Sequence, residues 1–95
     1  NEKLAEKLYH GLSEIKDVYL ISPDQERFRT SIISFGLKSM DYMDLAKKLG
    51  SAGFRVRVVF EAGLQAVRVS IHIYNSEDEI DALIAEVNAL AVASL

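Results

Sequence analysis

From Arg68 to Asp81 the chain reads Arg-Val-Ser-Ile-His-Ile-Tyr-Asn-Ser-Glu-Asp-Glu-Ile-Asp, a strand pattern that runs directly into a helix start. Apolar and polar residues alternate through its first half, and a period of two gives a strand one apolar and one polar face. The apolar set is Val67, Val69, Ile71 and Ile73, and the polar set is Arg68, Ser70, His72 and Tyr74. Ser76, followed three residues later by Glu79, forms a capping box that predicts a helix from about Glu77 to Leu90. The polar face, with one arginine among uncharged residues, is therefore a candidate for ligand contact.

Two further helices are predicted from apolar residues at helical spacing. The first carries Leu4, Leu8 and Leu12, and Gly11 is expected to mark its end. The second follows Asp41, whose carboxylate can cap the helix. Gly53 is expected to stop it in a left-handed cap, with Gly50 as the less favoured alternative.

Three more strands are predicted, at residues 17–21, 27–35 and 54–60. The segment Gly36 to Ser39 is expected to break the second of them. The third alternates Phe54, Val56, Val58 and Phe60 on its apolar side with Arg55, Arg57 and Val59 on its polar side.

The order of elements predicts an α+β fold of type αββαββα in a single domain spanning residues 1–95. Strand pairs that alternate with helices favour a mostly antiparallel, four-stranded sheet backed by three helices on one face. The arginines would then lie on the open face, where a partner domain or a ligand can reach them.

Composition excludes several classes of function. Eleven basic and fourteen acidic residues give a net charge of −3, and no segment has the basic character of a nucleic-acid footprint. No stretch is apolar enough for a membrane span or a signal segment, so we expect no membrane partner and a cytoplasmic location. The chain has no cysteine, and its two histidines, His10 and His72, do not suggest a metal site.

Three segments resemble the C-terminal small domain of class V aminotransferases. These pyridoxal-phosphate (PLP) enzymes include cysteine desulfurases, selenocysteine lyases and isopenicillin N epimerase-like proteins. The matching segments are Gly53-Phe54-Arg55-Val56-Arg57, Arg68-Val69-Ser70 and Tyr74-Asn75-Ser76-Glu77-Asp78-Glu79-Ile80-Asp81. The element order matches over essentially the whole chain. The resemblance implies the fold of the C-terminal domain of fold-type I PLP enzymes, as a fragment of a longer enzyme whose large cofactor-binding domain is absent.

The resemblance also implies roles for individual residues. Arg68 would bind the α-carboxylate of an amino-acid substrate, and a guanidinium suits that task because its planar fork grips a carboxylate bidentately. Arg57 matches a second family arginine near the mouth of the site. Ser70, His72 and Tyr74 are possible accessory residues.

No catalytic residue is expected in this chain, because the cofactor lysine of such enzymes lies in the large domain. We therefore expect PLP in the parent enzyme and none bound to the 95 residues alone. The implied partners are the large domain of the same polypeptide and an amino-acid substrate, in a homodimeric parent.

One departure from the family pattern limits the reaction. Cysteine desulfurases carry a catalytic cysteine between the two arginine strands, whereas residues 58–67 contain none. Desulfuration through an enzyme persulfide is therefore not expected, and aminotransferase, epimerase and carbon–sulfur lyase chemistry remain open.

Other interpretations remain open as well. Arg68 could be a structural arginine paired with Asp44, Glu61 or Asp81. The chain could be a freestanding α+β ligand-binding or protein-interaction module, because its element order also approaches that of ferredoxin-like regulatory domains. A purely structural dimerisation domain is a third alternative.

Overall fold

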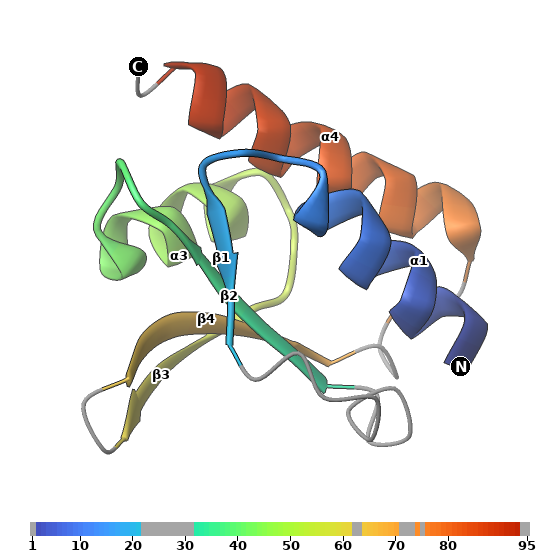
Figure 1. Cartoon of the computed structure of the whole chain (residues 1–95), viewed down its shortest axis with the longest axis horizontal. Helices are drawn as coiled ribbons and strands as arrows, with labels where there is room; N and C mark the ends of the chain where they lie inside the picture. Colours follow the sequence, from blue (N-terminus) through green and yellow to red (C-terminus); the bar gives the residue numbers. More distant parts are fainter. Residues whose placement is uncertain (1, 22–31, 62–63, 71–73, 75, 94–95) are drawn as a thin grey trace.

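The computed structural model describes residues 2–21, 32–61, 64–70, 74 and 76–93, which form three helices and a four-stranded sheet (Figure 1). The elements are α1 (Glu2–Ser13), β1 (Val18–Leu20), β2 (Ile32–Leu37), α3 (Tyr42–Ser51), β3 (Arg57–Glu61), β4 (Leu64–Ser70) and α4 (Glu77–Ala93). This order confirms the predicted αββαββα fold.

The sheet has the strand order β1-β2-β4-β3, and every neighbouring pair is antiparallel. Strand β4 is interior, and its residues Val67 and Arg68 have partners on both sides. Arg68 lies opposite Ser34 of β2 on one side and opposite Arg57 of β3 on the other. Side chains directly opposite one another share a sheet face, so this row of three residues lies on one face.

The hydrophobic core lies between the sheet and the helices, and α1 and α4 pack side by side over it (Figure 1). Strands β2 and β4 turn alternate residues toward the helices, as a period of two requires. The fully buried contributors are Ile33, Phe35, Val67 and Val69 from the sheet and Leu8, Leu12, Leu45, Leu49, Ile80, Leu83 and Val87 from the helices. One sheet face is therefore covered by helices, as predicted, and the row containing Arg68 lies on the other.

Local sequence signals set both ends of α3. The Asp41 carboxylate accepts a hydrogen bond from the Met43 backbone N–H at 3.0 Å and caps the first turn. At the other end Gly53 has a φ of 96°, and the Phe54 N–H donates to the Leu49 carbonyl at 3.0 Å. This is the bonding of a Schellman motif, so the predicted cap and stop are both confirmed.

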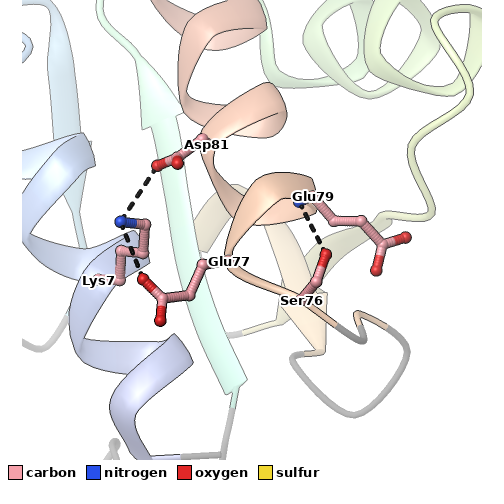
Figure 2. Close-up of polar contacts among 5 residues, drawn as sticks. All are labelled: Lys7, Ser76, Glu77, Glu79 and Asp81. Carbon is pink, nitrogen blue, oxygen red and sulfur yellow. Dashed lines mark hydrogen bonds and ion pairs between the residues drawn. The ribbon is translucent and has the colours of Figure 1, made fainter.

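The start of α4 is also set by its capping residue. The Ser76 hydroxyl accepts a hydrogen bond from the Glu79 N–H at 3.3 Å, as the capping box predicts (Figure 2). Two acids of the first turns then hold α1: Lys7 Nζ lies 3.4 Å from Glu77 and 3.3 Å from Asp81. Hydrogen bonds to Asp81 and then Glu77 raise the pKa of Lys7. These contacts join the first and last helices beside the strand-to-helix corner.

Two glycines were expected to end elements and instead lie inside them. Helix α1 continues past Gly11 to Ser13, because the absence of a side chain at Gly11 lets Ile84 of α4 approach closely. Strand β2 likewise continues through Gly36, because the ring of Tyr19 lies against it. Both glycines permit a close approach from a distant part of the chain.

The third strand begins later than predicted, and although Phe54 and Val56 pack against the core, Val58 is exposed. Strand β3 begins at Arg57, so the segment from Phe54 to Val56 precedes it. Val58 lies opposite the buried Val67 but is 49% exposed, because β3 is the edge strand, whereas Val59 on the other face is only 5% exposed.

The part of residues 27–35 before Ile32 lies outside the described residues. Within the described helices, none is both long and apolar enough to cross a bilayer.

Candidate functional site

The face of the sheet opposite the helices carries a cleft of about 440 Å³ lined by Arg55, Val56, Arg57, Arg68 and Ser70. We call it the arginine cleft. Arg68 comes from the interior strand β4 and is half-buried, whereas Arg57 comes from the edge strand β3 and is exposed. Three of the residues singled out from the sequence, Arg57, Arg68 and Ser70, are thus brought together.

The arginine cleft concentrates positive charge in an acidic chain. Its three cationic side chains are guanidinium groups, and no carboxylate is among the described residues that line the cleft. Arg57 and Arg68 are directly opposite on antiparallel strands, an arrangement that destabilises a sheet when the charges are alike. An anion bound between them would relieve this repulsion.

Arg68 is more buried than Arg55 and Arg57. Its side chain rises from a strand that is hydrogen-bonded on both sides, and its Nε is buried without a hydrogen bond in the described part of the chain. The residue has other polar interactions. Asp81, one of the acids considered as its structural partner, forms an ion pair with Lys7.

The other accessory residues occupy different places. Ser70 lines the cleft, two positions along β4 from Arg68. Tyr74 is only 7% exposed and belongs to the hydrophobic core, and its hydroxyl donates to the Arg55 carbonyl at 3.2 Å. Burial raises the pKa of Tyr74. His72 lies outside the described residues.

Arg55 was not predicted as a site residue. It lies two positions before Arg57, a spacing that places side chains on the same side of an extended segment. The sequence therefore contained the signal, but the residue was counted only as a polar member of an alternating strand. The hydrogen bond from Tyr74 fixes the main chain at Arg55 beside the cleft.

Tyr19 covers a second part of the same sheet face. Its ring lies over Gly36, and its hydroxyl donates to the Gln65 carbonyl of β4 at 2.6 Å. Burial and then the charge of Asp41 raise the pKa of Tyr19. A recess of about 330 Å³ beside it is lined by Lys38 and Asp41 among others. Charges of both signs meet there, so the recess lacks the single sign of the arginine cleft.

A larger groove of about 670 Å³ lies on the helical side, lined by residues of α3, Ala52 and residues of α4. Lys47 and Lys48 line it together with Asp44 and Glu86, again charges of both signs. Among the described residues, no lysine lines the arginine cleft, and no group of acids and histidines is arranged to hold a metal ion. The cleft therefore fits an anionic group such as a carboxylate and offers no amine for a cofactor aldehyde.

Comparison with known proteins identifies the family. The family described as aminotransferase class-V matches residues 1–83. The chain belongs to this family. A cysteine desulfurase of Haloferax volcanii is 31% identical over 97 aligned residues, which cover 93% of this chain and 22% of that enzyme. The resemblance carried by the three sequence segments is thereby confirmed.

Solved structures share the fold of this class V chain. The cystine C–S lyase C-DES, solved with its reaction product cysteine persulfide, superposes with a TM-score of 0.78 at 22% identity, over 90% of this chain and 22% of the lyase. A NifS-like protein gives a TM-score of 0.74 at 21% identity, over 99% of this chain and 27% of its own. A variant of C-DES was solved with glycine covalently linked to its PLP cofactor. The chain thus spans about a fifth to a quarter of the length of these proteins.

Proposed function

We propose that this chain is the small, substrate-binding domain of a longer PLP-dependent enzyme that acts on an amino acid. In this proposal Arg68 binds the α-carboxylate of the substrate, and the arginine cleft forms one wall of the active site. The observation that carries the proposal is the direct pairing of Arg57 and Arg68 in one cleft that no described carboxylate lines.

The position of Arg68 suits a carboxylate clamp. A bidentate guanidinium fixes the direction of the carboxylate as well as adding affinity. Because Arg68 rises half-buried from an interior strand, it loses little additional freedom when the ligand binds. Holding the substrate in one orientation lowers the entropy cost of reaching the reactive geometry.

The cofactor would be held by the large domain of the same polypeptide. When bound, PLP supplies the electron sink that this class of reaction requires. No lysine among the described residues lines the cleft, so these residues do not supply the amine that holds the cofactor. Their contribution is to bind the substrate's carboxylate.

The absence of cysteine narrows the reaction that this domain supports. A persulfide on the enzyme needs a thiolate, and the hairpin formed by β3 and β4 carries none. We therefore favour carbon–sulfur lyase, aminotransferase or epimerase chemistry over desulfuration through an enzyme persulfide. The family resemblance also supports a cytoplasmic, homodimeric parent enzyme.

The proposal is tested by Arg68→Ala and Arg68→Lys in the full-length enzyme. Loss of the charge-assisted hydrogen bonds should raise KM about tenfold to a hundredfold in Arg68→Ala. Arg68→Lys keeps the charge but lacks the planar fork of the guanidinium. It should therefore recover part of the affinity for the substrate, with a kcat that remains below the wild-type value. Lys3→Ala, which removes an exposed cation of α1, serves as the control and should behave as wild type. If kcat/KM were unchanged in both Arg68 variants, Arg68 would not be the clamp.

A further inference from the structure

The arginine cleft holds more positive charge than one α-carboxylate requires. A carboxylate carries one negative charge and is fully gripped by one bidentate guanidinium. With Arg68 in that role, Arg55 and Arg57 remain, and both are exposed at the same cleft. The chain as a whole has a net charge of −3, so this local excess is not a consequence of general basicity.

We propose that the enzyme's substrate is an amino acid with a second carboxylate, on its side chain, which Arg55 and Arg57 bind. The inference rests on the proposed function, because it takes the α-carboxylate to be held by Arg68. Arg55 and Arg57 are then the residues that determine specificity.

The placement of the three arginines supports this division of roles. Arg68 is the half-buried member, and Arg57 lies directly across from it on the edge strand. Arg55 lies two residues earlier, on the segment that enters the edge strand. An extended amino acid lying across the arginine cleft would place its two anionic ends on different guanidinium groups.

The main chain at Arg55 is anchored, which a specificity residue requires. The hydroxyl of the buried Tyr74 donates to the Arg55 carbonyl at 3.2 Å, and Val56 packs against the core. The guanidinium therefore extends from a fixed base although the side chain itself is exposed. A fixed base reduces the ordering that the side chain must undergo when an anion binds.

The experiment compares acids with their nearly isosteric amides in the full-length holoenzyme. L-aspartate is matched with L-asparagine, and L-glutamate with L-glutamine. Isothermal titration calorimetry gives each dissociation constant, and steady-state kinetics gives kcat/KM where turnover occurs. The variants are Arg55→Gln, Arg55→Lys, Arg57→Gln and Arg68→Ala, with Lys3→Ala as the control.

We expect the wild type to prefer the acid of at least one pair by about tenfold or more. Arg55→Gln should remove most of this preference by weakening the acid alone, and Arg55→Lys should restore part of it. Raising the ionic strength should reduce the preference, because the two arginines are exposed. Arg57→Gln should act in the same direction.

Two results would overturn the inference while leaving the proposed function intact. These are a wild type that binds each acid no better than its partner, and an Arg55→Gln variant that weakens acid and partner equally. The second result is what an Arg55 paired with an acid of the large domain would give. The proposed function fails separately, if Arg68→Ala binds every amino acid as wild type does.

Discussion

Tyr74 offers the sharpest test of how the core supports the arginine cleft. Tyr74→Phe removes one neutral hydrogen bond, the 3.2 Å bond to the Arg55 carbonyl, and retains the ring in the core. The expected loss is about 0.5–1.5 kcal/mol of the free energy of unfolding. Tyr74→Ala also removes a ring that is only 7% exposed, and a cavity of that size costs about 3–5 kcal/mol.

The assay is urea unfolding of the 95-residue chain at neutral pH, followed by far-ultraviolet circular dichroism, where a single core favours one cooperative transition. Tyr42→Phe is the matched control. It removes the hydroxyl of another buried tyrosine, on α3, and that hydroxyl donates no hydrogen bond within the described part of the chain. Its expected change is within about 0.5 kcal/mol. If the two Phe variants unfolded at the same urea concentration, the bond from Tyr74 would not anchor Arg55.

Two further predictions concern stability. Gly53→Ala should lower the free energy of unfolding by about 1–2 kcal/mol, because Gly53 has a φ of 96°. Gly50→Ala should raise it by up to about 1 kcal/mol, because Gly50 lies inside α3 and no atom lies near the added methyl group. Urea unfolding of both variants checks this, and equal losses would contradict it. Burial raises the pKa of Tyr19 and Tyr74, and carboxylates of α4 raise that of Lys7. All three groups hold their protons more tightly in the folded chain than in the unfolded chain. Their contribution to the free energy of unfolding is therefore complete below about pH 10, and it is lost as the pH rises through their pKa values in the folded chain. Stability that increased from about pH 9 to 11 would refute this sign.

The signals that predicted correctly act within a few residues. Asp41, Gly53 and Ser76 cap helices through bonds to neighbours in the sequence, so their roles could be read without the fold. The alternation of Val67, Arg68 and Val69 was also predicted correctly, because both valines belong to the core beneath the helices. Tyr74, which the same alternation placed on the polar face, instead lies in the core.

The predictions that failed depended on distant contacts. Gly11 resembles a helix stop until Ile84 of another helix is placed against it. Val58 has the alternation of a buried residue, but its strand lies at the edge of the sheet and leaves it half-exposed. Arg55 was missed because the cleft that it lines together with Arg68 forms only when separate parts of the chain come together.

The most direct measurement is the visible absorption spectrum of the full-length protein, recorded for wild type and Arg68→Ala while amino acids are added. We expect a visible band that borohydride removes in both proteins. We also expect an amino acid to shift this band in wild type at concentrations at least about tenfold lower than in Arg68→Ala. A colourless protein, or identical titrations for the two proteins, would contradict the proposed function.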